Sequence, residues 1–202
     1  MDRSVEEVLS PNLYFDPSFN TEAVKILPGE YYITARDMML VTTLGSCVAA
    51  CIRDRVSGIG GMNHFMLPDD RRDNGNPIGE SARYGNYAME MLINQLLKIG
   101  ARRSNLEAKV FGGGSVLRGF TTANVGKRNA EFALEYLKTE NIPVVASDLL
   151  DTYPRKVYFF PRTGKVKMKK LRDVHNDTII QREQSYSSLL RTADLQGGVE
   201  LF

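Results

Sequence analysis

Residues 48–52 (Val-Ala-Ala-Cys-Ile) constrain the fold most, because this run is apolar at every position. A strand with one buried face alternates apolar and polar residues, whereas a continuous apolar run is typical of a strand buried on both faces. A small-residue turn, Gly45-Ser46, separates the run from the β-prone residues 38–42. We therefore expect a central strand that begins directly after this turn.

Short β-prone runs recur along most of the remaining chain. They predict further strands at residues 31–34, 58–67, 106–111, 142–146, 156–160 and 166–169, of which the last two form a hairpin. Two stretches, 82–100 and 127–138, instead repeat apolar residues at steps of three and four, the periodicity of amphipathic helices. The pattern predicts an α/β fold with a layered mixed sheet and two main helices.

The ends of the chain differ from its middle. Residues 1–27 contain scattered Pro, Asp and Asn and predict an irregular N-terminal arm. Residues 173–202 predict a polar C-terminal tail with one short helix around 185–195, which leaves 28–172 as a single domain. We find no apolar run of signal-peptide or membrane-span length, which favours a cytoplasmic protein without membrane insertion.

Composition narrows the classes of function. The 26 Lys and Arg residues nearly balance the 24 Asp and Glu residues, which argues against a nucleic-acid-binding protein. The two cysteines and two histidines lack a zinc-ligand spacing, so we expect no metal. The run Gly112-Gly113-Gly114 lacks the Gly-Lys-Ser/Thr ending of a phosphate-binding loop, so it predicts a tight turn or a close approach of substrate to the backbone, and no cofactor.

Cys47 and His64 form the one candidate constellation for catalysis. A nucleophilic thiol needs a base, and two strands joined by a turn can bring an imidazole to it. Gly45 and Ser46 precede the thiol and are candidates for substrate binding, because glycine permits close approach and a main-chain N–H there can face an oxyanion. From these residues alone the alternative stays open that Cys47 and His64 are ordinary core residues, as we expect for Cys51.

Two longer blocks contain these candidates: Thr-Thr-Leu-Gly-Ser-Cys-Val-Ala-Ala-Cys-Ile at 42–52 and Gly-Gly-Met-Asn-His-Phe-Met-Leu-Pro at 60–68. Both blocks resemble signature blocks of the chemoreceptor glutamine deamidase family, CheD. Blocks at 82–90, 107–114, 126–129 and 154–159 also resemble the family in the same order, so the resemblance covers residues 28–171. One departure concerns local loop geometry: Leu150-Asp151 stands where the family often has Gly-Gly.

The resemblance implies a fold similar to the cysteine deamidase domain of cytotoxic necrotizing toxins, and a Cys–His–Thr triad. By this resemblance Cys47 attacks a glutamine side-chain amide, His64 is the base, and Thr42, which fits the form Thr-x-Leu-Gly-Ser-Cys, orients the imidazole. The implied partners are chemoreceptor cytoplasmic domains and a CheC-type phosphatase. A second hypothesis is a catalytically silent adaptor that binds a receptor or such a phosphatase.

Overall fold

The computed structural model describes residues 12–68, 80–116, 125–171 and 177–193. Its strands are β1 (Leu13–Asp16), β2 (Thr21–Lys25), β3 (Tyr31–Thr34), β4 (Met39–Leu44), β5 (Val48–Asp54), β6 (Gly60–Asn63), β7 (Leu106–Gly112), β8 (Val144–Leu149), β9 (Arg155–Phe160) and β10 (Lys165–Lys170). Its helices are α1 (Glu80–Lys98), the short 3-10 turn η2 (Arg103–Asn105), α2 (Val125–Thr139) and α3 (Asp177–Ala193). No helix in these ranges is long and apolar enough to cross a membrane.

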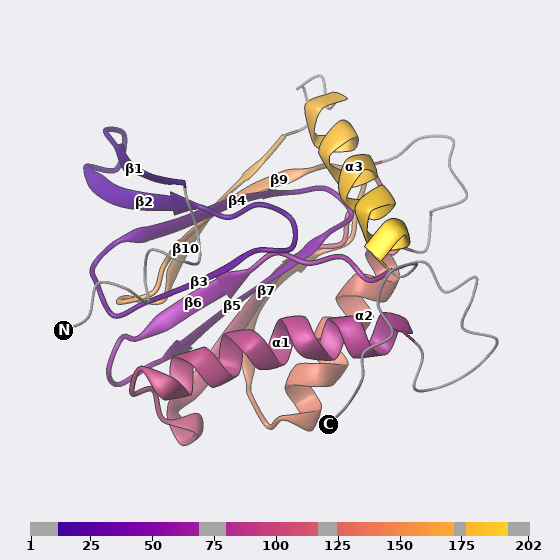
Figure 1. The fold of residues 1–202 in the computed structure, drawn as a ribbon. Helices are drawn as coiled ribbons and strands as arrows, with labels where there is room; N and C mark the ends of the chain where they lie inside the picture. Colours follow the sequence, from indigo (N-terminus) through magenta and orange to yellow (C-terminus); the bar gives the residue numbers. More distant parts are fainter. Residues whose placement is uncertain (1–11, 69–79, 117–124, 172–176, 194–202) are drawn as a thin grey trace.

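The strands form two mixed sheets of five strands each (Figure 1). The outer sheet has the order β1-β2-β4-β9-β10, and the central sheet has the order β3-β6-β5-β7-β8. Within them β2 pairs parallel with β4 and β7 pairs parallel with β8, whereas the other pairs are antiparallel.

The central sheet is buried on both faces. Figure 1 shows α1 and α2 beneath it and the outer sheet above it. Along β5, Val48, Ala50 and Ile52 belong to the core cluster that contains residues of α1 and α2. The intervening Ala49 and Cys51 belong to the cluster that contains residues of the outer sheet. Successive side chains of β5 therefore point into different apolar layers, which explains why residues 48–52 are apolar throughout.

The structure confirms the predicted α/β class, the two main helices and the 156–169 hairpin, which comprises β9 and β10. The expectation of irregular structure was wrong for residues 13–16 and 21–25, which form β1 and β2. They pair with each other, and β2 extends the outer sheet beside β4, so pairing with a distant strand orders this segment. The predicted short helix in the tail is longer and begins earlier, as α3. The toxin likeness and the three-part domain division stay predictions.

The loop after β8 passes close to the start of β9. Leu150 and Asp151 both have left-handed backbone angles, with φ of 65° and 71°. The fully buried Arg155 donates to the carbonyl of Gly112 at 2.9 Å and to that of Leu150. The amide of Leu150 also donates to the carbonyl of Gly112 at 2.9 Å. The glycine-like loop geometry is thus kept without glycine.

We predict that Leu150→Gly stabilises the protein. The left-handed conformation costs a non-glycine residue about 1–2 kcal/mol, and glycine's larger entropy loss on folding offsets about half of that. Leu150 is 42% exposed, so the burial lost with its side chain offsets part of this gain. We expect the free energy of unfolding in urea to rise by at most about 0.5 kcal/mol. Val145→Gly, at a 51% exposed position within β8, is the matched control and should destabilise. Equal losses in both variants would contradict the argument.

Candidate active site

The turn between β4 and β5 holds the peptide groups of residues 45–47 in one orientation. The carbonyl of Gly45 accepts from the amide of Gly114 at 2.7 Å, and the carbonyl of Cys47 accepts from that of Gly113 at 2.8 Å. Asn129 of α2 donates its side-chain amide to the carbonyl of Ser46 at 2.9 Å. Fixing the carbonyls of Gly45 and Ser46 on one side aims the N–H groups of Ser46 and Cys47, which share those peptide groups, toward the other side. The N–H of Gly45 points the same way, so the three N–H groups converge as in an anion-binding nest.

The glycine run after β7 makes this arrangement possible. Gly112 has φ of 118°, and a Cβ there would lie 2.1 Å from the carbonyl oxygen of Cys47. Gly113 has φ of 67°, and its Cβ would lie 2.6 Å from the carbonyl oxygen of Gly126. The glycine run therefore packs directly against the backbone of the Cys47 turn and of α2, and the predicted approach of substrate to this run stays a prediction.

The N–H groups of the turn converge on the carboxylate of Glu183, which comes from α3. One carboxylate oxygen accepts from the amides of Gly45 and Cys47, at 2.9 and 3.1 Å. The other accepts from the amide and the hydroxyl of Ser46, at 2.9 and 2.7 Å. Glu183 is 3% exposed, so these hydrogen bonds replace its contact with water. The turn can therefore bind a negatively charged oxygen.

His64 follows β6 and is held by a residue of the other sheet. Its Nδ1 lies 2.8 Å from the hydroxyl oxygen of Thr42 in β4. The single hydroxyl proton of Thr42 is donated to the carbonyl of Ile26 at 2.7 Å, so Nδ1 carries the proton of the His64–Thr42 hydrogen bond. Nε2 is then the unprotonated nitrogen, and it is buried without a hydrogen-bond partner in the described residues. The imidazole thus presents a basic nitrogen.

Strand pairing places Cys47 and His64 on the same face of the central sheet. Val48 and Phe65 form an antiparallel bridge with two hydrogen bonds of 2.9 Å. Continued by one residue, this register puts Ala49 opposite His64. Cys47 lies two residues before Ala49 and so is a diagonal neighbour of His64 on that face. The two predicted site residues are therefore brought together between the sheets.

Burial dominates the proton affinities of this pair. It raises the pKa of the Cys47 thiol well above its usual range, and the charge and hydrogen bond of Glu183 raise it further. Burial also lowers the pKa of His64 to about 4, although the charge of Glu183 opposes this shift. At neutral pH the pair is thus a thiol and a neutral imidazole rather than a thiolate and an imidazolium.

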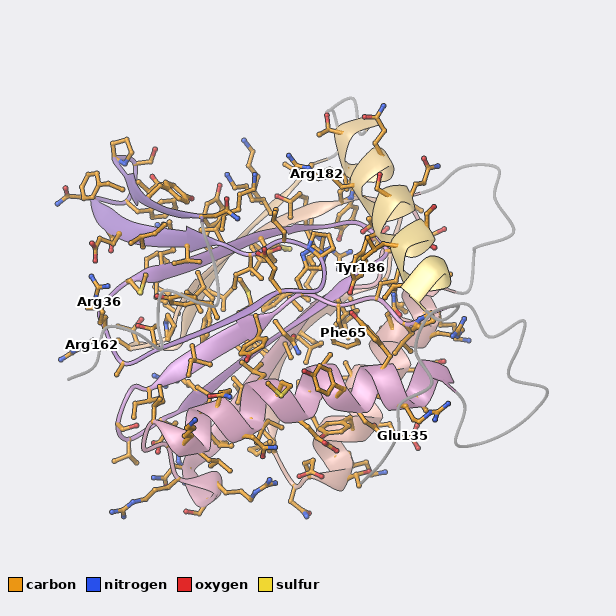
Figure 2. The ribbon with its side chains drawn as sticks, viewed as in Figure 1. Arg36, Phe65, Glu135, Arg162, Arg182 and Tyr186 are labelled. Carbon is orange, nitrogen blue, oxygen red and sulfur yellow. The ribbon has the colours of Figure 1, made fainter. Side chains whose placement is uncertain are left out.

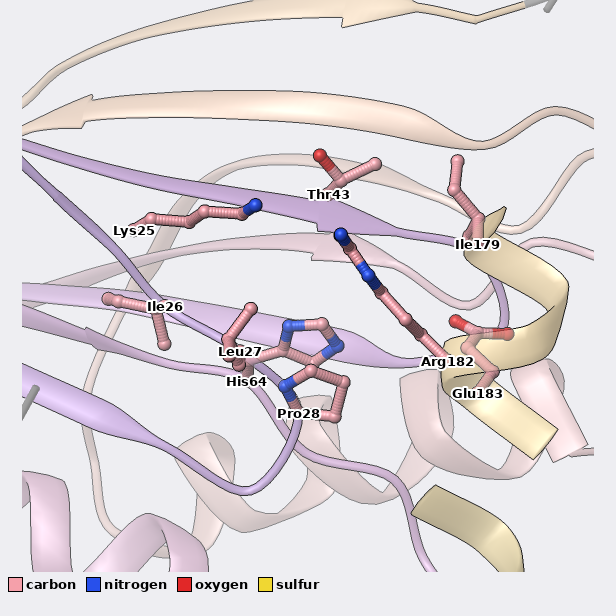
Figure 3. A pocket seen from close by; sticks show the side chains of 9 residues that line it. All are labelled: Lys25, Ile26, Leu27, Pro28, Thr43, His64, Ile179, Arg182 and Glu183. Carbon is pink, nitrogen blue, oxygen red and sulfur yellow. The ribbon is translucent and has the colours of Figure 1, made fainter. Parts of the chain in front are cut away.

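A small cavity lies beside His64 (Figure 3). Its volume is about 20 Å³, which is enough for a single water molecule. Thr43 lines this cavity, whereas the neighbouring Thr42 contacts the imidazole, as alternation along β4 requires. The rest of the lining comes from both ends of the chain: Lys25, Ile26, Leu27, Pro28, Ile179, Arg182 and Glu183.

Cys51 is a core residue, whereas Asn129 and Glu183 contact the Cys47 turn. Cys51 lies within β5, is 1% exposed and packs in the core between the sheets. Sequence reasoning missed Asn129, whose side-chain oxygen also accepts from the amide of Leu67 at 2.9 Å. It also missed Glu183, which was assigned to a polar tail. The available signal was the helical spacing of Ile179, Glu183, Tyr186 and Leu190, with a carboxylate on an otherwise apolar face.

Sequence comparisons relate this chain to known proteins along its length. Residues 66–170 match the model of the family described as "CheD chemotactic sensory transduction". A Thiobacillus denitrificans protein named "Probable chemoreceptor glutamine deamidase CheD" is 66% identical over the full length of both chains. A Methylobacillus flagellatus protein of the same name is 64% identical, again over both full chains.

Among solved structures, the Bacillus licheniformis hypothetical protein YfiH aligns with a TM-score of 0.37 and 14% identity. That alignment covers 60% of this chain and 49% of YfiH, a likeness too weak to bear on the fold. The family model and the full-length relatives are decisive: this chain belongs to the CheD family.

Proposed function

We propose that this protein hydrolyses the side-chain amide of glutamine residues in chemoreceptors and leaves glutamate. The supporting observation is that a thiol and three main-chain donors lie at one turn, with a neutral imidazole as the diagonal neighbour of the thiol on the adjacent strand. A cysteine hydrolase needs these three parts as nucleophile, base and oxyanion donors. Relatives that match over their whole length bear the name of this activity.

In the first half of the reaction, the sulfur of Cys47 attacks the amide carbon while Nε2 of His64 takes the thiol proton. Negative charge develops on the amide oxygen, and the N–H groups of residues 45–47 donate to it. The carbon–nitrogen bond then breaks. His64 returns the proton to the leaving nitrogen, so that ammonia departs and a thioester remains.

In the second half, water attacks the thioester carbonyl with His64 again as base. The carbon–sulfur bond breaks, which releases glutamate and restores the thiol. Thr42 acts as a positioning residue, because its hydroxyl fixes the ring orientation and the Nδ1–H tautomer.

One observation favours the second candidate, a silent adaptor that binds a receptor or a CheC-type phosphatase. Glu183 occupies the donors that a substrate oxyanion would need. An adaptor would bind receptor fragments without releasing ammonia. The enzyme remains our proposal, because an adaptor has no use for a buried base held in one tautomer.

We predict that Cys47→Ala abolishes deamidation and that Cys51→Ala retains it. Only Cys47 adjoins the main-chain donors, whereas Cys51 lies in the middle of β5. The measurement is ammonia release and the amide-to-acid mass change of a purified receptor cytoplasmic fragment. Equal loss in two folded variants would remove the distinction, and an inactive wild-type protein that still binds the fragment would favour the adaptor.

The adjacent threonines provide a matched pair. We expect Thr42→Ala to lower kcat roughly 10- to 1000-fold, the scale of losing a group that orients the base. Thr43→Ala should cost little activity, because alternation along β4 turns its side chain away from the imidazole that Thr42 contacts. Both variants are compared at saturating receptor fragment. A larger loss in Thr43→Ala would reverse the assignment.

The neutral state of His64 predicts how stability depends on pH. A pKa of about 4 in the folded state lies below the unfolded value of 6.5, so the unfolded chain binds more protons as the pH falls. Stability is therefore full above pH 6.5 and is lost toward pH 4. We expect the wild type to lose about 3 kcal/mol more than His64→Gln across this window in urea unfolding. Parallel curves for the two proteins would show that His64 is not buried in its neutral form.

A further inference from the structure

The helix α3 turns one face toward the body of the molecule. Ile179, Glu183, Tyr186 and Leu190 lie on this face, at spacings of four, three and four residues. Glu183 and Leu190 are buried, and Ile179 and Tyr186 are half-buried. The neighbouring Gln184 on the same helix is exposed. The helix therefore packs against the molecule through one face, and Glu183 contributes a carboxylate to that face.

Tyr186 anchors that face beside the active site, and Figure 2 shows it on α3. Its ring packs over Gly29, where an added Cβ would lie 2.9 Å from the ring. Its hydroxyl hydrogen-bonds with the hydroxyl of Tyr84 in α1. Contacts three residues beyond Glu183 thus fix the rotation of α3 and aim the carboxylate at residues 45–47.

The group that α3 inserts has the chemistry of the reaction product. Hydrolysis of a glutamine amide yields a glutamate carboxylate, and Glu183 presents that carboxylate to the three N–H groups and to the hydroxyl of Ser46. We propose that α3 is a built-in product mimic, which closes the active site until a substrate helix displaces it. This inference rests on the proposed function, since only a deamidase has this product.

The geometry argues against Glu183 as a catalytic residue. Both of its oxygens occupy the donors that must be free when the amide oxygen becomes negative. Its charge also opposes ionisation of Cys47, which lies one residue from Ser46. A carboxylate in this position hinders attack on an amide, whereas it fits the state after product has formed.

Closure by a tethered helix has a distinct kinetic signature. The open form alone binds substrate, so the apparent KM rises in inverse proportion to the open fraction while kcat is unaffected at saturation. The surface that α3 covers also indicates the shape of the substrate segment that would replace it. Because the side chain reaches the turn from a helix seated beside α1 and residues 25–29, a substrate segment that replaces it fits best as a helix.

The test uses the full-length protein and two readouts. We expect Glu183→Ala to raise the rate of Cys47 alkylation by iodoacetamide roughly tenfold or more, the scale of losing charged hydrogen bonds. It should also lower KM for a receptor cytoplasmic fragment and leave kcat unchanged. Glu183→Gln should act in the same direction, because its amide nitrogen cannot accept the N–H of Ser46.

Two further variants and an internal reference complete the design. Tyr186→Ala keeps the carboxylate but loses the contacts with Gly29 and Tyr84, so it should also speed alkylation of Cys47. Gln184→Ala, at an exposed position of α3, should change neither readout. Alkylation of Cys51, measured in the same digests, should stay slow in every variant because this thiol lies inside β5.

Unchanged alkylation of Cys47 in folded Glu183→Ala would overturn the proposal, and a fall in kcat would do the same by placing Glu183 in the catalytic machinery. The alkylation readout needs no receptor. Faster alkylation without receptor deamidation in any variant would support closure of the site and refute the proposed function, so the two failures are distinguishable.

Discussion

The fixed orientation of the peptide groups at residues 45–47 is the constraint on which the site depends. A trans peptide group carries its carbonyl and its N–H on opposite sides, so binding the carbonyls of Gly45 and Ser46 inside the protein aims the N–H groups of Ser46 and Cys47 outward. The amide of Gly114 and the side chain of Asn129 bind those two carbonyls, and the amide of Gly113 binds the carbonyl of Cys47. Because these donors come from different elements, the site forms only when β5, β7 and α2 are packed together.

The chemical state of the base depends on how the two sheets pack. Thr42 lies in the outer sheet and His64 directly follows β6 of the central sheet, so their hydrogen bond crosses the core between the two sheets. Burial keeps the imidazole neutral, and the threonine decides which nitrogen has the proton. The chemical state of the base is thus a property of sheet packing. A change that separates the sheets slightly would alter the base before it unfolds the protein.

Local patterns predicted much of this structure from the sequence. The apolar run 48–52 predicted the central strand, helical periodicity predicted α1 and α2, and the family resemblance singled out Thr42, whose hydroxyl lies 2.8 Å from the imidazole. Long-range pairing was not predictable in this way. The strands β1 and β2 are short and partly exposed, and β2 is ordered by β4. Glu183 meets the turn from more than 130 residues away. The apolar residues at helical spacing around it indicate a buried carboxylate, but they do not indicate which part of the chain it contacts.

The tether of α3 also affects which substrates the enzyme can accept. A group linked to its own binding site by a short chain has an effective concentration of about millimolar. A free amide or a short peptide at lower concentration would seldom displace Glu183, even if it fitted the turn. A segment held by further contacts on its own protein reaches a comparable local concentration and can compete. The helix thus favours glutamines on a protein that docks on the enzyme, and it keeps Cys47 from attacking other amides.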